Sequence, residues 1–408
     1  MKITIQNIGI ISEAAVEVNG ITLIAGPNDS GKSTIGKIFY SLVRGLNPDE
    51  VVFISEKNET IRNYYQQILR ILRDKKEIDV THFQTSKINE TWTIKVREVI
   101  EKFDPVQRAR LKNYCNFLDL EFDMSFNSMI SRQREVQKYF ALEFEDEIKS
   151  LFDNRKITRI FIEDIEGTAT IEYDDSIDYF KLNNNINTFY DNSFFIETPS
   201  LIDSSLQDSI LFEERFSREK KTHLKFALAN KASFIVSEDS TTLDINKIIE
   251  MISKIINGQL VVDDFQGVVY EKNGKEININ NVALGIKGFG LIQLLLRNEQ
   301  LNSRTLLIID EPEIHLHPMW QVKYAEILVL ISKNLEIPIL LTSHSPYFIE
   351  ALKAFSEKYK YSEKTKFYFT EKSNDGLSSK IVDVSSNISP ILVSISEAHF
   401  NISDIENE

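Results

Sequence analysis

The first fifty residues show hydrophobic patterns typical of strands, followed by a pattern typical of a helix. Residues 1–10, MKITIQNIGI, alternate apolar and polar positions, as expected of a strand with one buried face. Ile21 to Ala25 form a continuous apolar run, which is typical of a strand buried on both faces. After Lys32 apolar residues recur every three or four positions, which predicts an amphipathic helix. The chain is therefore expected to open with strands that lead into a helix.

Residues 55–155 carry a helical pattern. Apolar residues recur at helical spacing in 58–77 and again in 126–152, among charges of both signs. The pattern does not keep a heptad seam over many turns, so a short lid is expected rather than a long coiled-coil arm. Because basic and acidic residues nearly balance in this segment, a solvated helical surface or a protein-binding face is favoured over a DNA groove.

The rest of the chain alternates strands with helices. Alternating or continuously apolar segments predict strands at 156–165, 168–175, Thr305–Ile309 and Ile337–Leu341. A helix is expected over Phe289–Leu296, between the second and third of these strands. The order predicts an α/β fold with a mixed or parallel central sheet.

Composition narrows the class of protein without naming a function. The 408 residues exceed what one compact core usually holds, so a large domain with an insertion or second lobe is expected. No apolar run reaches the ~20 residues of a membrane span, and Met1 leads straight into a strand, so neither a membrane segment nor a signal peptide is expected. The single Cys115 excludes an internal disulfide and fits a reducing cytoplasm. The net charge of −14 counts against nucleic-acid binding over a broad surface, although a local basic groove or a basic partner is compatible with it.

The turn after Ile21–Ala25 carries the clearest chemistry. It contains the pattern G-x-x-x-x-G-K-[ST], in which glycines let backbone N–H groups turn inward toward phosphate oxygens. The helix that follows adds its positive N-terminal end. Lys32 is expected to reach the β and γ phosphates, and Ser33 to offer its hydroxyl to Mg²⁺. The predicted ATP-binding residues are Gly26, Pro27, Asn28, Asp29, Ser30, Gly31, Lys32, Ser33 and Thr34.

Two later strands end in residues suited to hydrolysis. Asp310 and Glu311 follow the strand at Thr305–Ile309, and adjacent carboxylates at a strand end point in different directions. Asp310 is expected to hold the Mg²⁺ shell, and Glu311 to polarise the attacking water, a contribution of ~10²–10⁴ in rate. The next strand delivers His344 to the same edge, where a neutral imidazole could sense the γ-phosphate or hold the lytic water. The predicted catalytic residues are therefore Lys32, Glu311 and His344.

Three segments together, GPNDSGKST, LLIIDEPEIHLHP and LLTSHSPYF, resemble the head domain of the SMC/RecF/OLD-type branch of ABC ATPases. The resemblance covers residues 1–50 and 260–352 strongly and the segment between them weakly. Within the branch, the chain looks most similar to the compact ATPases of bacterial anti-phage systems, including the Septu ATPase and retron-associated ATPases. By this resemblance Asp310 would be the Walker B acid, Glu311 the catalytic glutamate and His344 the switch histidine.

The resemblance implies an ABC-type P-loop head with an N-terminal β-subdomain, a mixed or parallel central sheet and a helical lid insertion. Residues 1–54 would form the N-terminal lobe with the phosphate loop, and 55–155 the lid. Residues 156–352 would complete the head with the signature, Walker B acid and switch histidine. Residues 353–408 are expected to form a cap, consisting of a hairpin turned at Asn374-Asp375-Gly376 and a short helix.

The signature region departs from the family pattern. In the ATPases that the chain resembles, a Ser-Gly pair of one subunit contacts the γ-phosphate held by the other, and here the Ser position falls on Leu284, followed by Gly285. Leucine cannot donate a hydrogen bond, so one contact across the dimer is expected to be lost and turnover to be slow. Lys287 is either a replacement cation or a solvated residue at a helix start. His317 and Pro318 fall where the resemblance places a loop at the dimer interface.

Two further sets of candidates lie in segments without a clear motif. Glu197 or Asp203 stands where the resembling ATPases keep a glutamine between lid and active site, although an exposed loop acid is the plainer interpretation. Arg215 to Lys225 form a basic cluster, for which an exposed charged helix is favoured over contact with nucleic acid.

The leading functional hypothesis is a cytoplasmic ATPase that uses ATP and Mg²⁺, forms a homodimer or larger homo-oligomer, and regulates a separate nuclease or toxin effector in anti-phage defence. Nucleic acid could be contacted through the complex, and no membrane is involved. The sequence carries no second metal-carboxylate constellation, so cleavage would belong to another polypeptide. The alternatives are a RecF-like DNA repair or loading ATPase and a scaffold that binds ATP without hydrolysing it. A transporter subunit is poorly supported because the signature and the HLHP turn differ.

Overall fold

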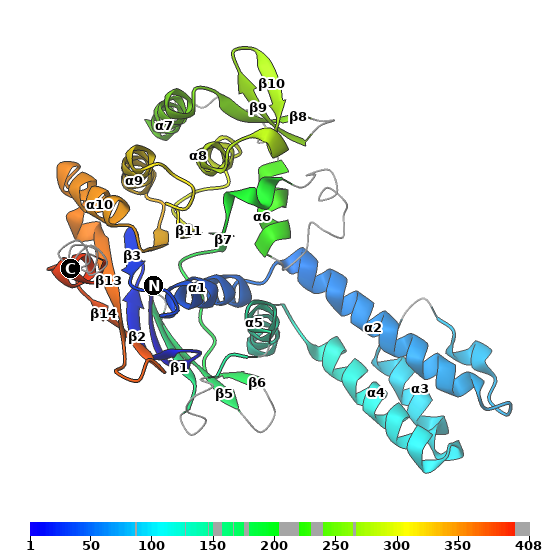
Figure 1. Cartoon of the computed structure of the whole chain (residues 1–408). Coiled ribbons are helices and arrows are strands. Elements are labelled where there is room, and N and C mark those ends of the chain that lie inside the picture. The colour runs from blue at the N-terminus through cyan, green and yellow to red at the C-terminus, as the bar shows by residue number, and fades with distance from the viewer. Residues whose placement is uncertain are drawn as a thin grey trace, which may run out of the picture. The chain divides into compact units, whose positions relative to one another are not determined.

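The structure, a computed structural model, describes residues 1–85, 88–126, 128–145, 147–149, 157–165, 167–174, 179–203, 220–229, 240–263 and 267–395. The chain falls into two units. The head comprises Met1–Asn47 and Glu135–Glu408, and the helical unit comprises Pro48–Arg134. Figure 1 labels the elements of both units.

An eleven-stranded sheet runs through the described part of the head in the order β6-β5-β4-β1-β2-β14-β13-β3-β12-β11-β7. Its strands are β1 (Lys2–Ile8), β2 (Ile11–Glu17), β3 (Ile21–Ala25), β4 (Arg159–Asp164), β5 (Gly167–Asp174), β6 (Tyr179–Leu182), β7 (Asn192–Ile196), β11 (Thr305–Asp310), β12 (Ile339–Ser343), β13 (Thr365–Lys372) and β14 (Ser379–Asp383). The strands from β6 to β2 pair antiparallel, whereas β13, β3, β12, β11 and β7 run parallel to one another. The mixed α/β fold expected from the sequence is therefore present.

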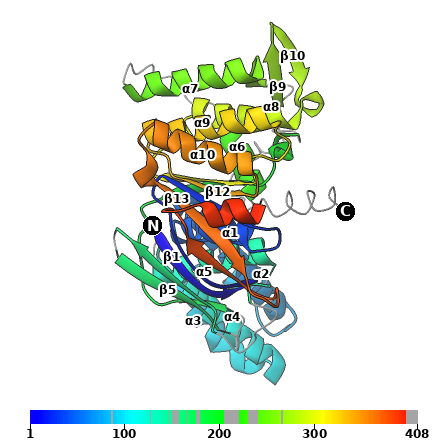
Figure 2. The same cartoon turned by 60° about the vertical axis from the view of Figure 1, so that its left-hand side comes forward.

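Helices cover both faces of the parallel strands. On one face lie α6 (Lys220–Ala229), α7 (Ser240–Ile256), α8 (Leu284–Arg297), α9 (Pro318–Asn334) and α10 (Pro346–Lys358), as Figure 2 shows for α8, α9 and α10. A smaller sheet accompanies α7 and α8 and consists of β8 (Gln259–Asp263), β9 (Gly267–Lys272) and β10 (Lys275–Asn278). Alternate strand residues enter opposite cores, so that Leu307 faces these helices while Ile308 faces α1. Helices cover both faces of β3 and β12, so every residue of these two strands is buried and most are apolar.

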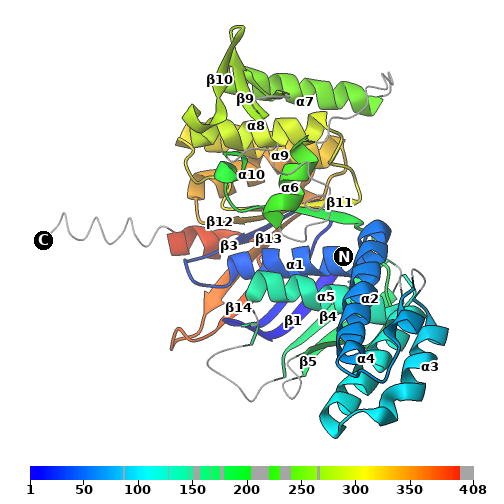
Figure 3. The same ribbon diagram turned by 90° about the vertical axis from the view of Figure 1, so that its right-hand side faces the viewer.

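On the other face, α1 (Lys32–Leu46) and α5 (Met129–Phe144) lie side by side (Figure 3). The two helices approach closely at Gly45, where a Cβ would lie 2.7 Å from the Cα of Val136. The antiparallel strands pack against the same core, which includes Tyr139, Phe140 and Phe180. This close contact attaches the second half of α5 to the head.

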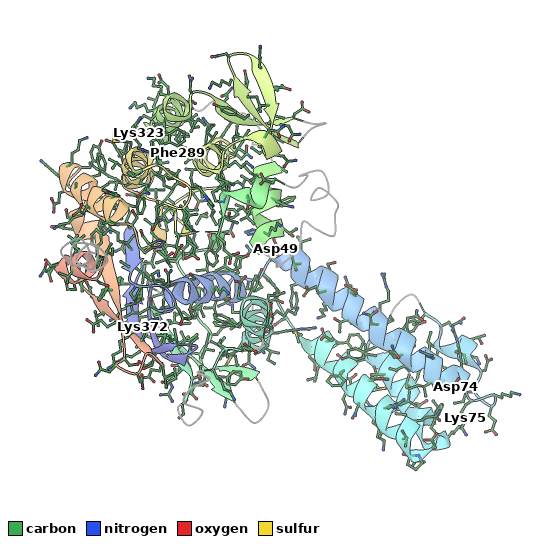
Figure 4. All side chains as sticks on the ribbon, viewed as in Figure 1. Asp49, Asp74, Lys75, Phe289, Lys323 and Lys372 are labelled. Carbon is green, nitrogen blue, oxygen red and sulfur yellow. The ribbon has the colours of Figure 1, made fainter. Side chains whose placement is uncertain are left out.

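The helical unit is built from α2 (Glu50–Arg73), α3 (Glu90–Val99) and α4 (Pro105–Asp123). The Asp49 side chain caps the start of α2 by accepting from two backbone N–H groups, and Figure 4 labels Asp49 and Asp74 at the two ends of this helix. The core of the unit forms around Trp92, whose Nε1 donates to the carbonyl of Phe83 at 2.8 Å. Among the described residues, no helix has the length and apolar character needed to cross a bilayer.

The divisions expected from the sequence differ from these units in three places, the first being that the helical unit begins at Pro48 and not at residue 55. The insertion was expected over 55–155, but the helical unit ends at Arg134 because the rest of α5 packs on α1. The segment 353–408 was expected to form a cap, but its hairpin supplies two strands to the interior of the main sheet, and β13 pairs directly with β3. Periodicity identified the hairpin correctly but could not specify where it pairs.

Gly45→Ala should lower the stability of the head. A helical Ala is intrinsically favoured over Gly by roughly 1 kcal/mol, but here its Cβ would overlap the α5 backbone, and such overpacking costs about 1–3 kcal/mol. Gly288→Ala in α8 is the matched control, because its Cβ meets only Pro199 Cγ at 3.5 Å. Urea unfolding followed by circular dichroism should show a lower midpoint for Gly45→Ala alone, and equal midpoints would contradict the α1–α5 packing.

Candidate active site

Parallel pairing brings distant residues to one edge of the main sheet. In spatial order, β13, β3, β12, β11 and β7 end at Lys372, Ala25, Ser343, Asp310 and Ile196. In register, Ala25 stands beside Ser343, and Thr342 beside Asp310. The carboxyl edge of such a sheet is where open α/β folds bind their ligands. The loop after β3 therefore faces the ends of β12 and β11.

The loop from Gly26 to Gly31 has a tightly folded backbone. Gly26, Asp29 and Gly31 have positive φ angles of 150°, 54° and 87°. A Cβ at Gly31 would lie 2.6 Å from Cγ1 of Ile11, so this position excludes any larger residue. The Lys32 ammonium donates to the carbonyl of Pro27 at 2.8 Å, and the Ser30 hydroxyl donates to the same oxygen at 2.7 Å. These bonds fold the loop back over the start of α1.

A cavity of about 680 Å³ opens above this loop. Its wall includes residues 28–34 of the loop, the β1–β2 turn at Gly9 and Ile10, and Glu311. The volume lies within the range of nucleotide-sized sites. Burial lowers the pKa of Lys32, whereas the nearby carboxylates of Glu311, Asp310 and Glu313 raise it. The cavity thus combines a helix N-terminus, an ammonium group and a set of carboxylates.

Ser33 and Asp310 meet at the base of the cavity. The Ser33 hydroxyl donates to Oδ1 of Asp310 at 3.0 Å, and the hydroxyl of Thr342 donates to the same oxygen. Mg²⁺ prefers oxygen ligands and typically takes one or two from the protein, the rest coming from phosphates and water. No cluster of three or more His, Cys, Asp or Glu side chains suited to a metal occurs among the described residues. The Ser33–Asp310 pair therefore fits Mg²⁺ that arrives with a nucleotide better than a metal held by protein alone.

Glu311 and His344 form a second pair at the same edge. The Nδ1 atom of His344 lies 3.3 Å from Oε1 of Glu311. Glu311 has a positive φ of 48°, and its N–H donates to the carbonyl of Thr342 at 3.2 Å. This turn sends the two adjacent carboxylates in different directions, as the sequence suggested: Asp310 toward Ser33 and Glu311 toward His344.

Glu313 was not singled out in the sequence, yet it organises this edge. Its Oε1 atom accepts from the Ser343 hydroxyl at 2.6 Å and from the backbone N–H groups of His344 and Ser345 at 2.9 and 3.1 Å. The side chain is buried, which raises the pKa of Glu313, while the hydrogen bonds from Ser343 and the backbone act in the opposite direction. Glu313 thereby fixes the position of His344. An acid two positions after Glu311 is typical of a surface turn, so only its burial identifies this role.

The helix expected over Phe289–Leu296 begins five residues earlier in the structure. Helix α8 starts at Leu284, and Ala283 occupies the N-cap position with no side-chain hydrogen bond. A Cβ at Gly285 would lie 3.3 Å from the carbonyl oxygen of His315, so the start of α8 packs against the turn before α9. Phe289, labelled in Figure 4, continues this packing with Tyr324 of α9 at a ring distance of 4.7 Å.

His317 and Pro318 have a local structural role in the described head. The Nδ1 atom of His317 accepts from the N–H of Met319 at 3.3 Å and caps α9, and Pro318 takes the first helical position. Both residues are exposed, beside the exposed side chains of Ile314 and Met319. His317 and Pro318 are therefore accessible to a partner protein on the same surface as the start of α8.

Lys287 fits neither interpretation made from the sequence. It is 2% exposed, and its ammonium pairs with Asp203, which follows the short helix η3 (Pro199–Ile202). Buried in this way, Lys287 is neither solvated nor directed to a partner's phosphate. Helical periodicity could not reveal this because its partner lies 84 residues away.

The remaining candidates lie at or near the last strand of the sheet. Glu197 directly follows β7, whose Ile196 stands beside Ile309, so Glu197 is exposed at the level of Asp310. Asp203 pairs with Lys287 as described. In the basic cluster at 215–225, residues 215–219 lie outside the described residues, and 220–225 belong to α6.

The phosphate-loop geometry and the acidic strand end define a P-loop ATPase of mixed α/β fold. Residues 1–349 match the family described as an AAA ATPase domain, so the chain belongs to this family of ATPases. It is 23% identical over 356 residues to the "Retron Vc95 probable ATPase" of Vibrio cholerae serotype O1 biovar El Tor, with 80% of this chain and 66% of that protein covered. The chain thus spans just under two thirds of that relative.

Solved structures similar to the chain include an SMC head domain from Thermotoga maritima. That match has a TM-score of 0.41 at 12% identity and covers 94% of this chain and 98% of the other. An ATP-binding cassette of an ABC transporter in its ADP conformation matches with a TM-score of 0.37 at 12% identity, covering 97% and 98%. The expectation of an ATPase is confirmed by the family match.

Asp203→Asn should destabilise the head by leaving the Lys287 ammonium buried without its counter-charge. Removing one partner of a fully buried pair costs about 3–5 kcal/mol, and the partial exposure of Asp203 reduces this to about 2 kcal/mol. In the double variant Asp203→Ala/Lys287→Met the buried charge is absent, so most of the loss should be recovered. Chemical unfolding of the two variants gives the comparison, and a double variant no more stable than Asp203→Asn would contradict the pairing.

Proposed function

We propose that this protein hydrolyses ATP with Mg²⁺ at the carboxyl edge of β3, β12 and β11. The observation that carries the proposal is the 3.0 Å contact between Ser33 and Asp310, beside the Glu311–His344 pair. This arrangement joins a phosphate-binding loop, two oxygen ligands for a divalent cation and a candidate general base. The family membership supports the same activity.

Each residue has a task that follows from its position. The N–H groups of the loop and Lys32 bind the phosphate chain, and Ser33 and Asp310 hold Mg²⁺. Mg²⁺ held there would supply positive charge against the phosphate oxygens. Glu311 orients the attacking water and accepts its proton. His344 stands beside Glu311, where its imidazole would contact the terminal phosphate, and Glu313 holds the His344 backbone by accepting from its N–H.

We also propose that the head assembles with further copies on ATP and that the assembly controls a separate nuclease or toxin in anti-phage defence in the cytoplasm. The start of α8 and the turn before α9 contact each other, and Ile314 and Met319 are exposed there, which suits a protomer interface. The name of the Vibrio cholerae relative, a retron ATPase, supports a role beside a partner protein.

Lys32→Ala should reduce ATP binding by at least about 100-fold, because it removes a charge-assisted contact to two phosphates and leaves acidic neighbours uncompensated. Lys323→Ala, at an exposed position of α9 that Figure 4 labels, is the control of equal charge change. Calorimetric titration with Mg-ATP measures both. If Lys32→Ala bound ATP as tightly as the parental chain, the loop at Gly26–Gly31 would not be the phosphate site.

Glu311→Gln should retain ATP and accumulate in the assembled form. The amide preserves the shape of the side chain but cannot accept the proton from water. Light scattering of this variant with and without Mg-ATP should show a larger native mass only with nucleotide, reversed by exchange into Mg-ADP. A mass that is indifferent to ATP would contradict the proposed assembly.

Ala283→Ser should raise the rate of ATP hydrolysis. The increase should grow with protein concentration, because the added hydroxyl acts on the nucleotide of a second protomer. A hydroxyl at the N-cap can reach beyond the start of α8 toward a partner's nucleotide, whereas the first helical residue, Leu284, is less well placed to do so. Leu284→Ser is therefore the matched comparison and should have the smaller effect. Steady-state phosphate release over a range of protein concentrations tests this, and no gain in either variant would mean that the missing hydroxyl does not limit turnover.

A further inference from the structure

We propose that Lys372, at the end of β13, is a second cation for the phosphates of the bound nucleotide and that Asp29 holds it in place while the loop is free. The inference rests on the nucleotide site proposed above. It extends that site to a hairpin beyond residue 349, where the family match ends. No motif in the sequence pointed to this lysine.

The hairpin of β13 and β14 is fixed to the phosphate loop by buried contacts. The hydroxyl of Thr370 donates to the Ser30 hydroxyl at 2.7 Å, and the hydroxyl of Ser379 donates to the Ser30 carbonyl at 2.8 Å. A Cβ at Gly26 would lie 1.8 Å from the Thr370 hydroxyl, so the strand touches the loop backbone itself. The two elements therefore keep a fixed spacing.

The strand period directs Lys372 toward the loop. Phe369 stands beside Ala25 in the parallel pairing, so the last residues of β13 continue past the end of β3 at the level of the loop. Residues two apart in a strand share a face, and Thr370 already faces Ser30. The Lys372 side chain, labelled in Figure 4, accordingly reaches Asp29, with 3.9 Å between its ammonium nitrogen and Oδ2.

Lys372 lies outside the wall of the cavity at the phosphate loop but contacts Asp29, which is part of that wall. Asp29 lines the cavity and is 87% exposed, so its carboxylate would repel the phosphate chain of an entering nucleotide. Lys372 lies close enough to Lys32 that its positive charge opposes protonation of that ammonium. Two ammonium groups at one loop are stabilised by a multivalent anion between them. A triphosphate would supply that anion.

The Asp29–Lys372 pair is suited to exchange. At 3.9 Å, with Lys372 31% exposed, it is a loose surface pair of the kind that contributes little to stability. The polyanionic phosphates offer a stronger partner than a single exposed carboxylate. Lys372 therefore moves from Asp29 to the phosphates when nucleotide binds, and Asp29 acts as a competitor that weakens binding.

The test compares Lys372→Ala, Asp29→Asn and the double variant by calorimetric titration with Mg-ATP and Mg-ADP. Lys372→Ala should weaken ATP binding about tenfold, the value expected for one charge-assisted contact. Asp29→Asn should tighten it, and Lys372→Ala should still weaken binding about tenfold in the Asp29→Asn background. Lys380→Ala is the matched control, because Lys380 belongs to the same hairpin but pairs with Glu13 of β2 at 3.3 Å.

The double variant separates the alternatives. If Asp29→Asn/Lys372→Ala binds as tightly as Asp29→Asn, Lys372 only screens Asp29 and the inference is wrong. Equal binding by Lys372→Ala and the parental chain also overturns it, while leaving the nucleotide site intact. If the parental chain binds neither Mg-ATP nor Mg-ADP, the proposed function is wrong. The inference about Lys372 is then wrong as well, because it requires a bound phosphate.

Discussion

The parallel pairing of β13, β3, β12, β11 and β7 is the constraint on which the rest of the molecule depends. Hydrogen bonds between neighbouring strands fix the register, and a common direction places every carboxyl end at one edge. Ser33 and Asp310, 277 positions apart, come within 3.0 Å for this reason. The helices on both faces keep water from the strands, so the edge is where polar groups gather.

The same pairing explains how a flexible glycine-rich turn acquires a defined shape. The loop is supported from below by α1, from one side by Ile11 and from the other by Thr370. Each neighbour lies so close that only glycine fits at Gly26 and Gly31. Support from both sides holds the N–H groups in position before any ligand arrives, which reduces the entropy lost on binding.

Much of this could be predicted from local pattern. The run at β3, the glycine spacing and the acidic end of β11 predicted a phosphate loop, and chain order predicted His344 near Glu311, where the structure places it. The β12 strand was expected from Ile337 but begins at Ile339, because Pro338 lacks the N–H needed for the ladder. Local pattern also located the C-terminal hairpin but not its partner strand, since pairing depends on residues far away in the chain.

The features that local sequence pattern could not reveal depend on contacts between distant segments. Glu313, Lys287 and Lys372 are charged residues, for which exposure is the usual expectation. The fold instead places Glu313 under His344, Lys287 against Asp203, and Lys372 beside Asp29. Helix α8 begins at Leu284 and not at the expected Phe289, since helix ends are placed poorly by sequence pattern.

Glu311 is proposed to activate water at a Mg-ATP site formed by the phosphate loop and Asp310. This role is tested most directly by single-turnover hydrolysis in the parental chain and in Glu311→Gln, with bound nucleotide quantified in the same samples. The account predicts equal occupancy by ATP and a phosphate-release rate lower in the variant by roughly 10²–10⁴. Hydrolysis at the parental rate in Glu311→Gln would contradict it.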